Sequence, residues 1–247
     1  MATGLARKLL ESIGLRKESG TDGSAGMVRN GPPSVVPCVM ALDVSGSMSS
    51  NDNIGKLNIG LRAFHEQISA CDVKDYLDVA IVTFGPVKVF QDFTPFRQWY
   101  PPELRIDGGT PLFEALDKSM LLLNEQKGNY KRYQLSCGRP WIFCITDGAP
   151  TDSDISNVAA RLQTAETNGE LTAICIGTPG FALNAMLNIF TPEHVFALEN
   201  MNYAALFGFF RDMIIADNSS DNADYIDPTK TVTPPSDVKA VGFTRGR

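Results

Sequence analysis

The 247-residue sequence lacks several features that would assign a function directly. Its five cysteines include no Cys-x-x-Cys pair and form no C-terminal cluster. We therefore expect neither a zinc site nor a disulfide framework, and we interpret the cysteines as reduced, buried thiols. The only two histidines, His65 and His194, lie in a helical pattern and just before a strand pattern, which predicts packed or solvated roles for them.

Long apolar runs and basic clusters are also missing. No segment approaches the roughly 20 apolar residues that a membrane-spanning helix needs, and the first residues lack the apolar stretch of a signal peptide. The net charge is -6, and no basic patch stands out in the central region, which argues against a nucleic-acid partner. We expect a cytoplasmic protein without a membrane span.

What the chain does contain is a regular alternation of strand and helix patterns. Near-continuous apolar runs, typical of strands buried on both faces, occur at 35–44, 77–84, 140–148 and 170–177. Amphipathic patterns between and after them predict helices, which include 53–70, 108–123, 155–169, 182–190 and 202–216. This order predicts an α/β fold, with a doubly wound, mostly parallel, Rossmann-like sheet. A hairpin over 78–93 should supply one antiparallel edge strand, because its connection is too short for a crossover helix.

The alternation also divides the chain. We expect a short helix and a linker over 1–34, one domain over 35–216, and a disordered or draped tail over 217–247. The N-terminal helix is interpreted either as loosely docked or as a helix that docks on a partner or a membrane surface. A scaffold that acts through these two end segments is one possible function.

Small oxygen-bearing side chains follow the predicted strands where ligands bind in open α/β sheets, beyond the carboxyl ends of the strands. They belong to "DVSGSM", "GGTP" and "TDG", and they are Asp43, Ser45, Ser47, Thr110 and Asp147. Hydroxyl and carboxylate oxygens suit a hard divalent cation, with Mg²⁺ favoured and Mn²⁺ or Ca²⁺ as alternatives. Two carboxylates among neutral hydroxyls leave such an ion barely neutralised, so a partner's Asp or Glu could complete its coordination.

These motifs, in this order and at these strand ends, resemble the metal-ion-dependent adhesion site of von Willebrand factor type A (VWA) domains. The phrases "VTFGP" and "RPWIFCITDGAPTD" further resemble stand-alone bacterial VWA proteins of the tellurium-resistance (TerY-like) group. The resemblance implies direct metal binding by Ser45, Ser47 and Thr110, with Asp43 and Asp147 often acting through water. It also implies a non-catalytic role in binding protein partners, with phosphatase-like or kinase-like partners in stress or phage-defence systems.

An enzymatic alternative is a Mg²⁺-dependent phosphohydrolase, because an Asp after a buried strand resembles haloacid-dehalogenase-type phosphatases. Those enzymes place a second Asp two residues later, where this chain has Ser45, which cannot transfer protons near neutral pH. The sequence has no G-x-S-x-G elbow and no P-loop. Asp152 and Asp154 are predicted to be first-turn carboxylates of the helix that follows them.

Overall fold

The computed structural model describes residues 34–219 and 227–241. The helix and linker expected over 1–34 fall outside this range, except for Ser34, which begins the first strand. No helix within these two ranges is long and apolar enough to cross a membrane.

The described residues form one eight-stranded sheet. Its strands are β1 (Ser34–Asp43), β2 (Leu77–Phe84), β3 (Lys88–Pro95), β4 (Ser136–Cys137), β5 (Trp141–Thr146), β6 (Thr172–Gly177), β7 (Val195–Leu198) and β8 (Val238–Ala240). Their order is β3-β2-β1-β5-β6-β7-β8, and the short β4 pairs with the start of β1. All neighbouring strands are parallel except β2–β3 and β7–β8. The predicted doubly wound, mostly parallel fold is confirmed.

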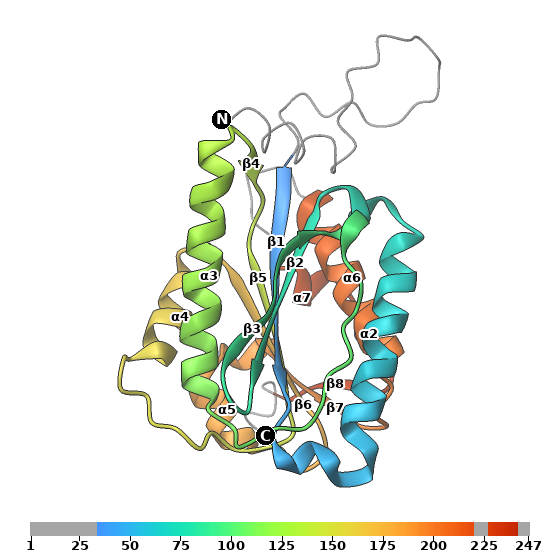
Figure 1. The fold of residues 1–247 in the computed structure, drawn as a ribbon, viewed down its shortest axis with the longest axis vertical. Helices are drawn as coiled ribbons and strands as arrows, with labels where there is room; N and C mark the ends of the chain where they lie inside the picture. The colour runs from blue at the N-terminus through green and yellow to red at the C-terminus, as the bar shows by residue number, and fades with distance from the viewer. Residues whose placement is uncertain (1–33, 220–226, 242–247) are drawn as a thin grey trace.

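Helices cover both faces of the sheet (Figure 1). They are α2 (Asn53–Ser69), α3 (Leu112–Arg132), α4 (Val158–Thr167), α5 (Leu183–Ile189), α6 (Tyr203–Ser219) and α7 (Pro228–Thr231), with 3-10 turns η1 (Gly46–Asp52), η2 (Asp72–Asp75), η3 (Phe96–Gln98) and η4 (Pro192–His194). The apolar faces of α2 and α6 pack on one side, and those of α3, α4 and α5 pack on the other.

The first strand shows why the sequence needs two helical layers. Successive side chains of a strand point to opposite faces of the sheet. Accordingly, Cys38 and Met40 enter the core under α2 and α6, whereas Val39 and Ala41 enter the core under α3, α4 and α5. Because β1 is apolar at every position over 35–42, it lies in the middle of the sheet with both faces covered.

The sheet has two antiparallel edge strands, where the sequence predicted one. The 78–93 hairpin forms as expected, as β2 and β3. The second edge strand is β8, which pairs with β7 and comes from the stretch predicted to be a disordered or draped tail. Its three residues are too few for a periodic apolar pattern, and the partner strand rather than local preference stabilises them.

Candidate metal centre

The five predicted oxygen donors end strands or lie in the loops that follow them, at the carboxyl edge of the sheet. In Figure 1 this edge is at the bottom, where α2 and α3 begin. Asp43 is the last residue of β1, and Asp147 directly follows β5. These two strands are neighbours, and the chain runs outward from them in both directions, from β1 to β2 and β3, and from β5 to β6 and β7. Their junction is thus the topological switch point, where open α/β sheets leave a crevice for a ligand.

Asp43 is fully buried, and both of its carboxylate oxygens accept hydrogen bonds. Ser45 donates its backbone N–H to Oδ1 at 2.8 Å, and Thr146 donates its hydroxyl to Oδ2 at 2.6 Å. Burial raises the pKa of Asp43, and the hydrogen bonds from Ser45 and Thr146 oppose that rise. The protein thus fixes this carboxylate in one orientation, with Thr146 as a partner that the sequence analysis did not assign.

Ser45, Ser47 and Asp147 form a continuous chain of polar contacts. The two serine hydroxyl oxygens lie 2.9 Å apart, and Ser47 donates to Asp147 Oδ1 at 2.5 Å. Asn53, in the first turn of α2, directs its amide toward the other Asp147 oxygen at 3.5 Å. Sequence analysis did not assign Asn53 to this site, because a contact across 94 residues leaves no local signal.

Thr110 reaches the same crevice from the loop before α3. A Cβ atom placed on Gly148 would lie 3.5 Å from Thr110 Oγ1 and 3.8 Å from Ser47 Oγ. Both hydroxyls therefore flank Gly148, the residue after Asp147. The absence of a side chain there leaves space between Thr110 and Ser47, and the structure brings all five predicted residues together.

Backbone contacts hold the two ligand-bearing loops against each other. Gly46 donates its N–H to Gly108 O at 3.0 Å, and Asp107 donates to Val44 O at 2.6 Å. Gly85, at the end of β2, has a φ of +133°, and a Cβ there would lie 2.2 Å from Asp107 O. Only glycine fits this close approach without moving the loop, a requirement that sequence reasoning missed.

The donor set fits a hard divalent cation. It combines two carboxylates with three neutral hydroxyls, and it contains no thiol or imidazole. In the parts of the chain that the structure describes, no group of three or more His, Cys, Asp or Glu side chains is arranged so that it could hold a metal ion. Soft metals that prefer sulfur or nitrogen are therefore poor candidates at this edge of the sheet, whereas Mg²⁺, Mn²⁺ and Ca²⁺ match its oxygens.

The two carboxylates Asp152 and Asp154 act as helix caps, but neither lies in the first turn of α4 as predicted. Asp154 precedes α4 and accepts from its first N–H groups, at Val158 and Ala159, so the predicted contact with the start of this helix is present. Asp152 instead accepts from Phe113 and Glu114 at the start of α3. The prediction for Asp152 is wrong because spacing along the chain cannot show that another helix begins nearby.

Both histidines are packed. His65 stacks on Phe96 and Tyr100, whereas His194 is buried between two carboxylates.

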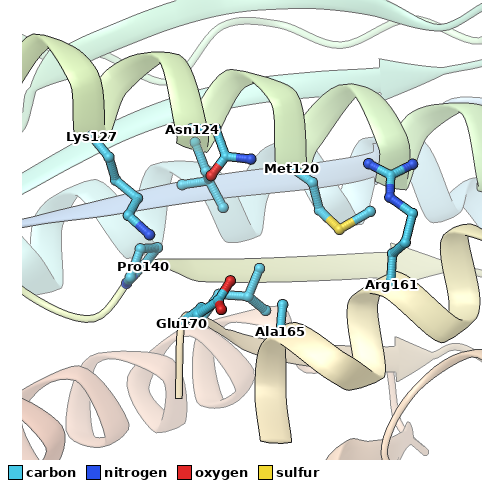
Figure 2. A pocket seen from close by; sticks show the side chains of 9 residues that line it. Met120, Asn124, Lys127, Pro140, Arg161, Ala165 and Glu170 are labelled. Carbon is cyan, nitrogen blue, oxygen red and sulfur yellow. The ribbon is translucent and has the colours of Figure 1, made fainter. Parts of the chain in front are cut away.

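A cavity of about 150 Å³ between α3 and α4 lies apart from the candidate metal centre (Figure 2). Its lining includes Met120, Lys127 and Arg161 but none of the five oxygen donors.

Comparison with known proteins supports the fold. No protein-family model and no curated protein matches the sequence. Among solved structures, the chain is similar to the pilus adhesin SpaC from Lactobacillus rhamnosus GG, with a TM-score of 0.57 and 14% identity. The match covers 74% of this chain and 30% of SpaC, so the chain spans less than a third of that protein. An open conformation of SpaC gives the same values.

Proximal thread matrix protein 1 from the mussel byssus is also similar, with a TM-score of 0.49 and 16% identity over 70% of this chain and 44% of that protein. At 14% identity, the likeness to SpaC concerns the fold alone. The described residues of this chain form a mixed α/β fold with a mostly parallel sheet.

Proposed function

We propose that this chain is a VWA-type interaction module, in which a divalent cation at Asp43, Ser45, Ser47, Thr110 and Asp147 captures an acidic residue of a partner protein. The observation that carries the proposal is the convergence of five hard oxygen donors from three loops at the switch point of the sheet. Mg²⁺ is the favoured ion.

The charges of the donors explain why such an ion would bind a partner. Three of the five donors are neutral hydroxyls, and both oxygens of Asp43 already accept hydrogen bonds from the protein. A cation held in this way keeps much of its attraction for an incoming carboxylate, as a cation site open to a ligand requires. The partner's Asp or Glu thus completes the site.

The biological setting is a second part of the proposal, and it rests on the sequence resemblance. The tellurium-resistance-like phrases place the chain in a cytoplasmic stress-response or phage-defence system, with phosphatase-like or kinase-like partners. The module itself performs no catalysis in this account.

Partner capture is tested with the purified protein as bait in a lysate of its natural host. We expect partners to be retained in Mg²⁺ and lost in EDTA, and lost equally in the Thr110→Ala variant in Mg²⁺. Asp72→Ala is the matched control, because Asp72 is an exposed residue of η2, outside the metal centre. Partners that are retained in EDTA would contradict a role for the metal in capture.

Phosphohydrolase activity is the contrasting function, and the residue two positions after Asp43 disfavours it. Haloacid-dehalogenase-type enzymes have a second Asp there for proton transfer, whereas this chain has Ser45, which cannot transfer protons near neutral pH. We expect no turnover of p-nitrophenyl phosphate in Mg²⁺. Turnover that the Asp43→Asn variant abolishes would overturn the proposal of a binding module.

A further inference from the structure

The loop after β5 carries more than the carboxylate of Asp147. Four residues later, Thr151 contacts Thr110 through two reciprocal hydrogen bonds. Thr151 donates its backbone N–H to Thr110 O at 2.9 Å, and its hydroxyl oxygen accepts the Thr110 N–H at 3.1 Å. Both backbone polar groups of Thr110 are therefore engaged by one residue, 41 positions further along the chain.

The next residue, Asp152, holds the helix that follows Thr110. Its carboxylate accepts the N–H of Phe113 at 3.2 Å and the N–H of Glu114 at 2.8 Å. The residue at the N-cap position of α3, Pro111, makes no side-chain cap of its own. Asp152 therefore supplies the cap from a distant part of the sequence, where a carboxylate also favours the positive end of the helix.

Thr110 is thus held on two sides, at its own backbone by Thr151 and at the start of α3 by Asp152. Its hydroxyl lies beside Gly148, which belongs to the same loop as Thr151 and Asp152. One short segment, 147–152, therefore carries the carboxylate of Asp147 and also holds the backbone of Thr110, whose hydroxyl lies beside Gly148.

We propose that Thr151 and Asp152 are positioning residues of the metal centre, which hold the Thr110 hydroxyl where a cation can bind it. This inference rests on the proposed function, because it assumes that Thr110 is a metal ligand. Residues that orient ligands from behind affect metal affinity by roughly 10- to 100-fold in known sites. The two residues act through Thr110 and do not touch the ion.

The role of Thr151 is tested by a double-mutant cycle on Mg²⁺ affinity, measured by calorimetry on the full chain. Thr151→Val keeps the shape of the side chain and removes the hydroxyl. We expect roughly a ten-fold loss of affinity in the otherwise unchanged protein, and no further loss in the Thr110→Ala background. Thr164→Val, which removes a hydroxyl that bonds to Ala160 O within α4, should leave the affinity unchanged.

The role of Asp152 is tested against Asp154, because each caps one helix through two backbone N–H groups. Asp152→Ala and Asp154→Ala should both lower the midpoint of thermal unfolding. Only Asp152→Ala should also weaken Mg²⁺ binding. A purely structural cap would lower the midpoint without changing the affinity.

The outcomes separate this inference from the proposed function. If the unmodified chain binds Mg²⁺ but Thr151→Val and Asp152→Ala bind it equally well, the positioning role is overturned and the metal site stands. If Thr151→Val lowered the Mg²⁺ affinity equally in the unmodified protein and in the Thr110→Ala variant, that result would also contradict action through Thr110. If the unmodified chain binds no divalent cation, both proposals fail together.

Discussion

Ser47 and Asp147 are 100 residues apart in the sequence, and their side chains meet at 2.5 Å, with the serine hydroxyl donating to Oδ1. This contact joins the loop after β1 to the loop after β5. Because the two strands lie side by side at the centre of the sheet, the rigid core sets the distance between the loops. The pairing of β1 with β5 therefore holds the two loops of the candidate site next to each other.

Replacing Ser47 with alanine should weaken Mg²⁺ binding by roughly ten-fold or more, because it removes one of five proposed ligands. The variant also loses the hydrogen bond to Asp147, so the free energy of unfolding should fall by roughly 0.5–1.5 kcal/mol. Calorimetry with Mg²⁺ and chemical denaturation measure the two effects. Ser49→Ala is the control from the same turn, and it should leave the affinity unchanged. Similar affinities for the two variants would remove Ser47 from the site.

Gly85→Ala should destabilise the fold by roughly 1–3 kcal/mol, because its positive φ strains any side chain. The added Cβ would also lie 2.9 Å from Gly109 O and 3.2 Å from Ser45 N, so Mg²⁺ binding should weaken as the loop shifts. Gly128→Ala is the control, since a Cβ there meets nothing within 4 Å in the interior of α3. That change should stabilise the protein by roughly 0.5–1 kcal/mol. Urea denaturation of both variants measures these changes in the free energy of unfolding. A Gly85→Ala variant that is as stable as the unmodified protein would contradict the prediction.

We expect His194 to make the stability of the protein depend on pH. Its Nδ1 lies 2.7 Å from Glu166 Oε1, and its Nε2 lies 3.1 Å from Asp227 Oδ2, just before α7. Burial alone would lower the pKa of His194, but hydrogen bonds and charge from Asp227 and Glu166 outweigh it and raise the pKa to about 9. Arg139, Glu193 and Lys230 also line the adjoining cavity of about 200 Å³.

Because the folded protein holds this proton more tightly than the unfolded chain does, the stabilisation is complete below about pH 6.5 and is lost as pH rises through 9. We expect the unmodified protein to be roughly 2–3 kcal/mol more stable than His194→Gln at pH 6, and the gap to shrink by pH 10. Urea denaturation of both proteins across that range measures the gap. A gap that stays constant with pH would show that folding does not raise the pKa of His194.

The sequence could predict those parts of the molecule that depend on local pattern. The uniformly apolar stretch over 35–44 can only be buried on both faces, which predicted a central parallel strand and two helical layers. The same reasoning predicted that Asp43 and Asp147 lie at one edge of the sheet, because the carboxyl ends of parallel strands lie at the same edge. The structure places the residues that the motif singled out close to one another.

Features that arise from contacts between distant segments could not be predicted in the same way. Asp152 was assigned to the wrong helix, since its cap on α3 spans 38 residues. The strand β8 depends on β7 rather than on its own three residues. Position 85 needs a glycine because the backbone oxygen of Asp107, on a different loop, lies too close for a Cβ atom. The sequence around either residue gives no sign of this contact. In each case the determining partner is far away in the sequence.

Calorimetric titration of the full chain with Mg²⁺ tests the central claim most directly. We predict one binding site per chain in the unmodified protein and in Asp72→Ala, and loss of that site in Asp147→Ala, whose circular dichroism should match that of the unmodified protein. Equal Mg²⁺ binding by all three proteins, or no binding by any, would contradict a metal centre built on Asp147 and its neighbours.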